Sequence, residues 1–268
     1  MKKPLLKLDN LSHVYYSVRE ETVALKHISL EVKEGEFFGL VGPSGSGKTT
    51  LLSIMAGVLT PTEGQIQLCE GDIHTDVGYM LQHDHLFEWR SIYDNVILGL
   101  EINRKKTPEN LQYAEELLKK YGLHEFMKHH PQELSGGMRQ RAALIRTLVL
   151  RPKIILLDEP FSALDYQTRL SVAEDVRAII KNEGLTAILV THDISEALSL
   201  CDRIAVLTAR PATVKAIHEV PLEGDSFERR EDARFAAYFK AIWKELEIHE
   251  EKSTNNRTST ISKPPNSE

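Results

Sequence analysis

A glycine-rich segment near the start of the chain constrains the fold more than any other feature. It reads Gly-Pro-Ser-Gly-Ser-Gly-Lys-Thr at residues 42–49, between a short apolar run at residues 37–41 and a stretch with helical spacing at residues 48–57. The backbone amides of such a loop, together with the N-terminus of the next helix, form a nest for anions. We therefore predict a strand, a phosphate-binding loop and a helix in succession, rather than a chance glycine-rich turn.

Two side chains of this loop have individual tasks in the prediction. Lys48 is expected to reach the β- and γ-phosphates of a nucleotide, and the Thr49 hydroxyl is expected to ligate Mg²⁺. The residues expected to hold the nucleotide here are Gly42, Pro43, Ser44, Gly45, Ser46, Gly47, Lys48, Thr49 and Thr50.

Two adjacent carboxylates follow a second apolar run, residues 154–157. In an open parallel sheet, ligands bind at the carboxyl ends of the strands. We expect Asp158 to hold Mg²⁺, directly or through water, and Glu159 to polarise an attacking water as a general base. A solvated pair at a strand end is the alternative, and the phosphate loop in the same chain argues against it.

Hydrophobic periodicity predicts the main elements around these motifs. Residues 5–11 and 23–32 alternate between apolar and polar side chains, which is typical of antiparallel strands with one solvated face. Residues 154–157 and 186–190 are continuously apolar and lie on either side of a long helix at residues 166–182, which is typical of parallel strands buried on both faces. The region between the two motifs is helical in pattern, with amphipathic stretches at residues 91–100, 108–121 and 137–150.

The predicted fold class is therefore α/β, with a P-loop NTPase (RecA-like) core. Its sheet is mainly parallel, and it carries an antiparallel β subdomain and a helical insert subdomain at about residues 90–150. After a helix around residues 232–246, apolar residues become rare. We predict one domain over residues 1–249 and a disordered tail over residues 250–268.

Composition excludes several classes of protein. The formal net charge of -6 over 268 residues does not favour binding to nucleic acid. No stretch approaches the roughly 18 to 20 apolar residues that cross a bilayer. Cys69 and Cys201 stand far apart, which argues against a disulfide scaffold or a zinc site and for a reducing compartment. We expect both cysteines to be small buried apolar residues.

A second glycine motif opens the last helix of the insert. It reads Leu-Ser-Gly-Gly-Met-Arg-Gln-Arg at residues 134–141, with Ser135 at a capping position. The motif predicts a second anion-binding helix N-terminus, which one nucleotide bound by one subunit does not need. Together with the acidic pair downstream, it closely resembles the signature of the ATP-binding cassette (ABC) family, and the resemblance covers roughly residues 5–247.

This resemblance implies ATP hydrolysis in a head-to-tail dimer. In the family, the signature of one subunit grips the γ-phosphate of the nucleotide held by the other. Ser135, Gly137 and Gln140 would carry these contacts between subunits, with Gly136 in the same motif. A simple helix cap is the alternative reading of Ser135.

The other motifs of the family also have counterparts. Tyr15 resembles the aromatic residue that stacks on adenine, with Tyr16 as its rival. Gln82 resembles the glutamine that touches Mg²⁺ and water, and His192 resembles the histidine that senses the γ-phosphate and orients the water. Residues 162–165 resemble the loop that crosses the dimer interface.

The functional assignments implied in this way fall into two groups. Glu159, His192 and Lys48 are the expected catalytic residues. Thr49, Gln82 and Asp158 are the expected ligands of Mg²⁺. One departure from the family is a shorter stretch between Gly64 and Gln82, which leaves the chemistry unchanged.

A segment after Gln82 narrows the resemblance to one subgroup. Residues 87–96 are similar to the Pro-Trp-Arg segment of importer ATPases of the nitrate/sulfonate/taurine type, with Glu88 in place of the proline. Residues 238–246 also resemble that subgroup. In the family, the aromatic residues of this segment border the surface that docks a membrane permease, although core packing of the helical lobe could claim half of them.

The implied partners are the integral-membrane permease subunits, a second ATPase subunit and, indirectly, an extracytoplasmic solute-binding protein. The implied location is the cytoplasmic face of the cell membrane, and the implied cargo is a small organic or inorganic anion or a related solute. A soluble ABC ATPase with a non-transport role is the alternative function. A kinase or other P-loop phosphotransferase would lack the signature, and a pure binding module is hard to reconcile with Glu159. The histidines at positions 83, 85, 129 and 130 lack the partners of a credible metal site.

Overall fold

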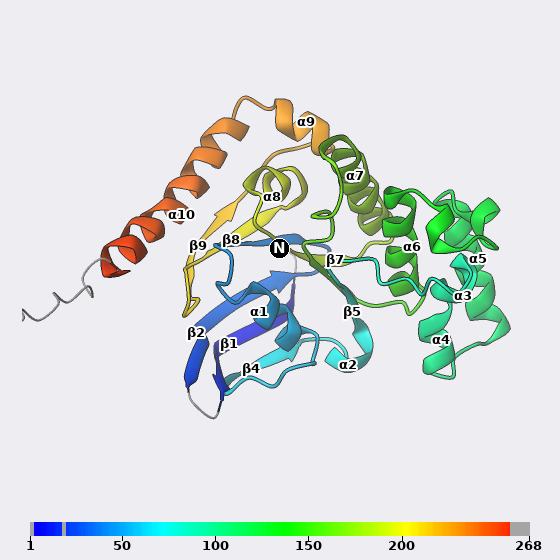
Figure 1. Ribbon diagram of the computed structural model, residues 1–268, viewed down its shortest axis with the longest axis horizontal. Coiled ribbons are helices and arrows are strands. Elements are labelled where there is room, and N and C mark those ends of the chain that lie inside the picture. The colour runs from blue at the N-terminus through cyan, green and yellow to red at the C-terminus, as the bar shows by residue number, and fades with distance from the viewer. Residues whose placement is uncertain (1–2, 18–19, 258–268) are drawn as a thin grey trace, which may run out of the picture.

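Two β-sheets form the framework of the protein (Figure 1). The computed structural model describes residues 3–17 and 20–257. The strands are β1 (Pro4–Tyr16), β2 (Glu21–Lys33), β3 (Phe37–Val41), β4 (Glu63–Leu68), β5 (Val77–Met80), β6 (Ile154–Asp158), β7 (Thr186–Thr191), β8 (Arg203–Leu207) and β9 (Val214–Glu219). A small antiparallel sheet has the order β2-β1-β4, and a larger sheet has the order β5-β6-β7-β3-β8-β9. The larger sheet is parallel except for β9, which confirms the predicted α/β class.

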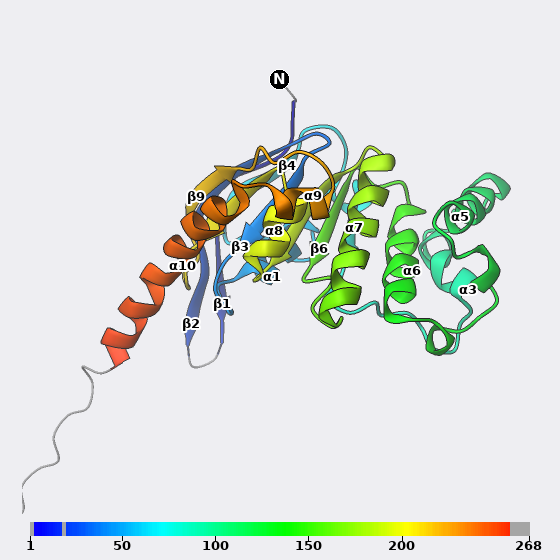
Figure 2. The same ribbon diagram turned by 90° about the horizontal axis from the view of Figure 1, so that it is seen from above.

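Apart from α1 and α2, the helices gather into a lobe beside the larger sheet and a layer on one of its faces (Figure 1). The helices are α1 (Lys48–Met55), α2 (Ile73–Asp76), α3 (Ile92–Val96), α4 (Leu98–Ile102), α5 (Pro108–Lys120), the 3-10 turns η1 (His124–Phe126) and η2 (Pro131–Glu133), α6 (Gly136–Leu148), α7 (Tyr166–Asn182), α8 (Ile194–Leu200), α9 (Ser226–Glu231) and α10 (Phe235–Arg257). In both views α3, α5 and α6 lie together at one end of the molecule, with α4 beside them in Figure 1, and α7 stands between α6 and α8 (Figures 1 and 2). The helical insert is thus a separate lobe that meets the sheet both through α7 and directly, where Thr147 of α6 packs against Gly78 of β5.

The strands of the larger sheet are buried on both faces, as their continuous apolar runs predict. In β6, Ile155 and Leu157 pack into the cluster that includes α7, α8 and the helical lobe. Ile154 and Leu156 point the other way, into a cluster with α1 and the antiparallel sheet. Each such buried side chain contributes about 1.5–3 kcal/mol relative to exposure. The sheet therefore forms a rigid plate whose strand ends can hold functional loops.

Helix α1 is enclosed between the two sheets. Leu51, Leu52, Ile54 and Met55 are all buried and belong to the cluster that joins both sheets. A helix that is apolar around most of its circumference needs such a fully covered position. The burial of α1 fixes the direction in which its N-terminus, and hence the loop before it, faces.

Two predicted helices differ from those in the structure, one by an internal break and the other by its end point. The helix expected at residues 91–100 is two short helices, α3 and α4, with a break at Ile97 (φ -83°, ψ 0°). The second of them packs closely on Leu150, since a Cβ atom at Gly99 would lie 2.9 Å from its Cδ1 atom. Helix α10 runs to Arg257, past the expected end at residue 246, because the chain contains no glycine or proline up to that point. Residues 258–268 of the predicted tail lie outside the described residues.

The two cysteines occupy different environments. Cys201 is buried, as predicted, whereas Cys69 is exposed, so that part of the prediction is wrong. Strand β4 ends with the buried side chain of Leu68, and the next residue therefore points away from the core. Among the described residues, no helix is both long and apolar enough to cross a membrane.

Candidate functional site

The carboxyl ends of four neighbouring parallel strands bring the predicted residues together. Strand β3 pairs with β7, β7 with β6, and β6 with β5. The residues that follow these strands share one edge of the sheet. Gly42 follows β3, His192 follows β7, Glu159 follows β6 and Gln82 comes shortly after β5. The topology thus assembles at one edge motifs that are spread over 150 residues of sequence.

The glycines of the phosphate loop allow a backbone that other residues resist. Gly45 has φ +71° and Gly47 has φ +109°, both in the left-handed region. A Cβ atom at Gly47 would also lie 3.0 Å from Leu25 Cδ2 and 3.1 Å from the Ala24 carbonyl oxygen. The loop therefore wraps tightly against β2 and leads into α1 at Lys48, which gives it the anion-nest form expected from the motif.

Lys48 lies folded under the loop. Its side chain is only 6% exposed, and Nζ donates hydrogen bonds of 2.9 Å to the carbonyl oxygens of Gly42 and Pro43. Burial lowers the pKa of Lys48, while the nearby carboxylates of Glu159 and Asp158 act in the opposite direction. The ammonium group is thus partly desolvated and held at the mouth of the nest, where a phosphate group could replace its backbone partners.

A set of oxygen atoms next to the loop fits a hard divalent cation. Thr49 Oγ1 lies 3.4 Å from Asp158 Oδ1, and the Tyr79 hydroxyl donates to Asp158 Oδ2 at 3.2 Å. Burial raises the pKa of Asp158, against the hydrogen bonds from Tyr79 and Thr49. Hydroxyl and carboxylate oxygens are the ligands that Mg²⁺ takes alongside nucleotide phosphates. Thr49 and Asp158 are therefore suited to share such an ion.

Glu159 and His192 form a direct pair at the same edge. His192 Nδ1 lies 3.0 Å from Glu159 Oε2. Glu159 adopts a left-handed backbone conformation, with φ 44°, and its N–H donates to the Val190 carbonyl oxygen at 2.9 Å. This conformation is uncommon for a residue with a side chain, and it turns the carboxylate from the strand end towards His192. The pair has the geometry of a base and its orienting partner.

Gln82 approaches the pair through a serine. Gln82 Nε2 donates to Ser162 Oγ at 3.4 Å, and Ser162 Oγ donates to the Glu159 carbonyl oxygen at 2.9 Å. The side-chain amide of Gln82 therefore contacts the loop at residues 162–165 and not Asp158. Gln82 is thus at the predicted edge of the sheet and connected to the region around Glu159.

The aromatic residues of β1 differ in how they face the loop. The Tyr15 hydroxyl lies 3.1 Å from Thr50 Oγ1, and its ring stands edge-on to His13 at 4.7 Å between centroids. Tyr15 is 43% exposed, so one side of the ring is available for stacking. Tyr16 is more exposed, at 67%, and within the described part of the chain its side chain makes no hydrogen bond to the loop. Tyr15 is therefore the better placed of the two to stack on a base next to α1.

The signature motif lies away from this group of residues. Ser135 is exposed and caps α6, accepting a hydrogen bond from the Met138 N–H at 3.3 Å. Helices α6 and α1 stand apart in both views (Figures 1 and 2). The structure therefore does not bring Ser135 to the nucleotide site of its own chain.

Gln140 does not share the exposure of Ser135. Its side chain is 3% exposed and its Oε1 atom is buried, three residues after Gly137 on the face of α6 that packs inward. In this structure the side chain therefore faces the interior of its own chain, and its contact with another subunit stays a prediction. The helical period places Ser135 and Gln140 on different faces although they are close in sequence.

Gly137 has a packing role that can be tested. A Cβ atom there would lie 2.7 Å from Val172 Cγ2 of α7. Glycine to alanine in a helix normally stabilises by up to about 1 kcal/mol. At this position we expect Gly137→Ala to destabilise instead, by about 1–3 kcal/mol, because the contact is overpacked. Urea unfolding measures the effect, and the double variant Gly137→Ala/Val172→Ala should regain part of the loss; a stabilised Gly137→Ala protein would contradict the packing role.

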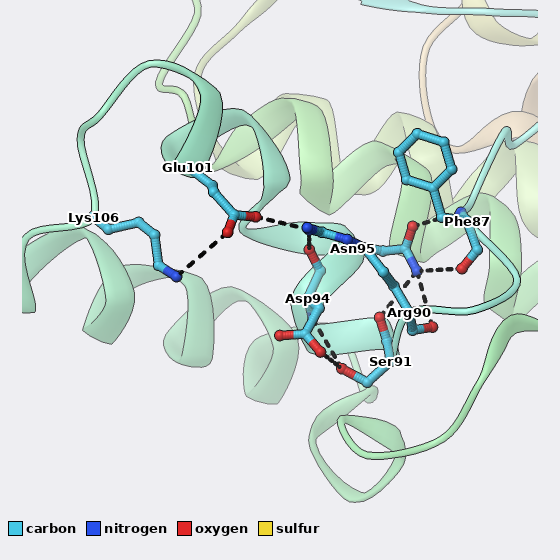
Figure 3. A network of polar contacts seen from close by, with 7 residues as sticks. All are labelled: Phe87, Arg90, Ser91, Asp94, Asn95, Glu101 and Lys106. Atoms are coloured by element: carbon cyan, nitrogen blue, oxygen red, sulfur yellow. Dashed lines mark hydrogen bonds and ion pairs between the residues drawn. The ribbon is translucent and has the colours of Figure 1, made fainter.

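The segment at residues 87–96 presents aromatic side chains to solvent. Trp89 is 73% exposed and its ring lies 4.8 Å from that of Phe87, whereas Ile92 and Val96 are buried. The fully buried Asn95 holds the turn before α3: its Nδ2 group donates to three backbone carbonyl oxygens and its Oδ1 accepts from the Phe87 N–H at 2.7 Å (Figure 3). The aromatic pair thus projects from a rigid turn and is not part of the core.

Two side chains around the site, Tyr79 and Arg210, were not predicted from the sequence, and Ser162 was expected only as part of the loop at residues 162–165. Tyr79 hydrogen-bonds Asp158, Ser162 connects Gln82 to Glu159, and the Arg210 guanidinium donates to the Gly45 carbonyl oxygen at 3.0 Å. Burial, with the nearby Asp158 charge, raises the pKa of Tyr79 to about 12, so the phenol stays a donor. Of Tyr79 and Arg210, only Tyr79 has a signal in the sequence that could have found it, because it lies two residues before the end of a short apolar run.

The chain is similar in sequence and in structure to known proteins. A family model described as ABC transporter matches residues 25–162. The uncharacterized ABC transporter ATP-binding protein YtlC of Bacillus subtilis is 45% identical over 258 residues, covering 94% of this chain and 99% of the relative. The nitrate import ATP-binding protein NrtD of a Synechocystis species is 40% identical, covering 82% and 84%. The solved dimer of the ATP-binding cassette MJ0796, in a post-hydrolysis state with ADP and Pi, superposes with a TM-score of 0.67 at 32% identity, covering 82% of this chain and 99% of that one.

Proposed function

Because the chain belongs to the ABC transporter family and is one of its ATP-hydrolysing subunits, we propose that it powers an importer as a head-to-tail dimer beneath a membrane permease. In each of two composite sites, one copy supplies the phosphate loop and the other supplies Ser135 and the N-terminus of α6. Binding of two ATP molecules closes the dimer, and hydrolysis reopens it. Such a cycle shifts a population between two states according to their affinity for ATP.

The separation of the two anion-binding motifs within one chain carries this proposal. Lys48, Asp158 and Glu159 share one edge of the sheet, whereas Ser135 caps a helix in the lobe beyond α7. A two-fold axis that places the lobe of one copy over the sheet edge of the other would complete both sites at once. The exposed position of Ser135 supports this arrangement.

Within each site, the residues divide the work as their geometry suggests. Lys48 binds the β- and γ-phosphates, and Thr49 and Asp158 hold Mg²⁺, with Gln82 as a further ligand. Mg²⁺ would neutralise charge on the phosphate oxygens when it is bound. Glu159 takes a proton from the attacking water, and His192 orients that water and the carboxylate. Tyr15 stacks on the adenine.

The rigid turn with Phe87 and Trp89 is the proposed docking point for the permease. Exposed aromatic side chains held by a buried Asn95 network suit a partner groove, because their positions are fixed before binding. We propose that the subunit therefore works at the cytoplasmic face of the membrane, with a solute-binding protein as an indirect partner. The similarity to the nitrate import protein favours a small anion or a related solute as cargo.

A substitution at Ser135 tests the composite site. In the Glu159→Gln background, which slows hydrolysis, we expect Ser135→Arg to leave ATP binding by the monomer nearly unchanged and to abolish the ATP-dependent dimer. The physical reason is that the nucleotide is held by the phosphate loop of its own chain, while the bulky cation disrupts only the surface that receives the other copy. Equilibrium ATP binding and light scattering measure the two effects separately.

Gln112→Arg provides the matched control, since it adds the same charge to an exposed position of α5 in the same lobe. It should preserve both binding and dimer formation. A Ser135→Arg protein that still dimerises with ATP, or that loses ATP binding as a monomer, would count against the trans role of the signature.

A further inference from the structure

A small cavity lies behind the Glu159–His192 pair. Its volume is about 40 Å³, which is enough for a water molecule. Beyond the pair itself, it is lined by Ser162, Arg169, Thr191, Asp193 and Glu196. All of these side chains are polar or charged, so the cavity belongs to the electrostatic surroundings of the pair and not to the apolar core.

Glu196 is the most deeply buried acid of this cavity. It lies in the first turn of α8 and is 7% exposed. Its Oε2 atom accepts a hydrogen bond from Thr191 Oγ1 at 3.1 Å, and Thr191 Oγ1 in turn accepts from the Asp193 N–H at 3.0 Å. These two bonds join the residues on either side of His192. The conformation of the His192 segment is therefore linked to the Glu196 carboxyl group.

The second carboxyl oxygen of Glu196 is in a different situation. Within residues 3–17 and 20–257, Glu196 Oε1 is buried and meets no hydrogen-bond partner. A buried ionised carboxylate without a partner is costly, whereas a protonated carboxyl group costs much less. The geometry thus favours the neutral acid, and the cavity has room for a water that accepts a hydrogen bond from its carboxyl O–H.

The charges that face Glu196 come from several elements. Asp193 caps the same helix, Glu159 follows β6, and Arg169 approaches from α7 with its Nη2 donating to the Leu164 carbonyl oxygen. On the side of α9, the Arg230 guanidinium is directed at the Ser195 carbonyl oxygen at 3.5 Å.

These surroundings keep Glu196 protonated at neutral pH. Burial and the Asp193 carboxylate raise the pKa of Glu196 to about 8, while the Thr191 hydrogen bond and Arg169 act in the opposite direction. His192, which also lines the cavity, bonds Glu159 through Nδ1. Ionisation of Glu196 would add another carboxylate charge to a cavity that already has those of Glu159 and Asp193.

We propose that neutral Glu196 is a positioning residue for ATP hydrolysis, which fixes the Thr191–Asp193 segment and thereby holds His192 against Glu159. The proposal rests on the proposed roles of Glu159 and His192. When Glu196 ionises, the segment has to move to hydrate or pair the new charge, and the pair loses its alignment. Glu196 does not touch the substrate, so it acts on kcat and leaves KM for ATP unchanged.

The test is the pH profile of kcat for wild-type protein and for Glu196→Gln at saturating MgATP. Glutamine keeps an oxygen for the Thr191 hydroxyl and cannot ionise. We expect similar kcat values at pH 7. At pH 9, one unit above the pKa of Glu196, kcat relative to its value at pH 7 should be about tenfold lower for the wild type than for the variant. The comparison matters because the lowered pKa of Lys48 can also contribute an alkaline decline, and that contribution is common to both proteins.

Glu109→Gln on α5 is the matched control, since its carboxylate is exposed and distant from the cavity in sequence and fold. It should keep the wild-type profile. The inference is overturned if Glu196→Gln shows the same alkaline decline as the wild type, or if it loses activity at every pH. Should Lys48→Ala retain hydrolysis, the proposed site itself fails, independently of Glu196.

A second variant covers the case in which Glu196→Gln does not fold. Glu196→Asp still ionises but is too short to accept from the Thr191 hydroxyl. We expect a lower kcat at every pH, with KM unchanged and the alkaline decline retained. A wild-type kcat in this variant would overturn the positioning role, because the Thr191 bond would then be dispensable.

Discussion

Lys48→Ala is expected to reduce ATP hydrolysis by at least about a hundredfold, the usual cost of removing one preorganised group that stabilises charge in the transition state. In the structure its ammonium group is buried under the loop and bonded to two backbone carbonyl oxygens, so it is already close to where phosphate would bind. Truncation removes the positive charge and leaves both carbonyl oxygens facing the phosphates. Steady-state hydrolysis with MgATP and equilibrium binding of ATP measure the loss.

Two comparisons make the Lys48 result specific. Lys119→Ala removes an exposed lysine of α5 and should hydrolyse ATP at the wild-type rate. Lys48→Arg retains the charge, but the planar guanidinium does not fit a pocket that holds a compact ammonium group, so we expect it to remain strongly impaired. Normal hydrolysis by Lys48→Ala would show that Lys48 does not stabilise the phosphates of ATP and would contradict the proposed role of the loop.

The motifs at strand ends could be predicted from the sequence because their chemistry depends on local order. A glycine-rich loop between a strand and a helix, or a carboxylate pair after a buried strand, specifies its own surroundings within a few residues. The order of the strands could not be predicted in this way. Strand β3 comes first among the strands of the larger sheet but lies between β7 and β8, and only this order places Gly42 beside His192.

Residues whose roles depend on packing across the chain were the ones missed. Tyr79 lies on β5, where a short apolar run indicates a strand but does not show that the Tyr79 hydroxyl meets Asp158. Gln140 seemed to belong with Ser135 because they are close in sequence, yet α6 turns its side chain inward. Cys69 seemed buried by residue type, but the alternation of β4 places it outside. In each case the direction in which the element points the side chain, rather than residue type or closeness in sequence, decided where that side chain lies.

Glu159→Gln is expected to separate ATP binding from hydrolysis. Glutamine preserves the size of the side chain and an oxygen that can face His192 Nδ1, but it cannot accept a proton from water. We expect hydrolysis to fall by at least about a hundredfold, in line with the loss of a general base. ATP binding should persist, since Lys48 and the loop are unchanged. The closed dimer should therefore accumulate, and size-exclusion chromatography with light scattering, with and without MgATP, would detect it.

The result for this variant distinguishes two parts of the proposal. A dimer that forms only with MgATP, in a protein that no longer hydrolyses it, requires both the catalytic role of Glu159 and a surface that receives the nucleotide of another copy. Hydrolysis of ATP by Glu159→Gln at the wild-type rate would show that Glu159 is not a catalytic residue. A monomer that binds ATP without dimerising would instead count against the roles of Ser135 and Gly137 between subunits. For the Ser135→Arg variant in the same background, the Gln112→Arg control shows whether the helical lobe tolerates an added positive charge. If it does, the loss of the dimer in Ser135→Arg can be attributed to the signature and not to the lobe as a whole.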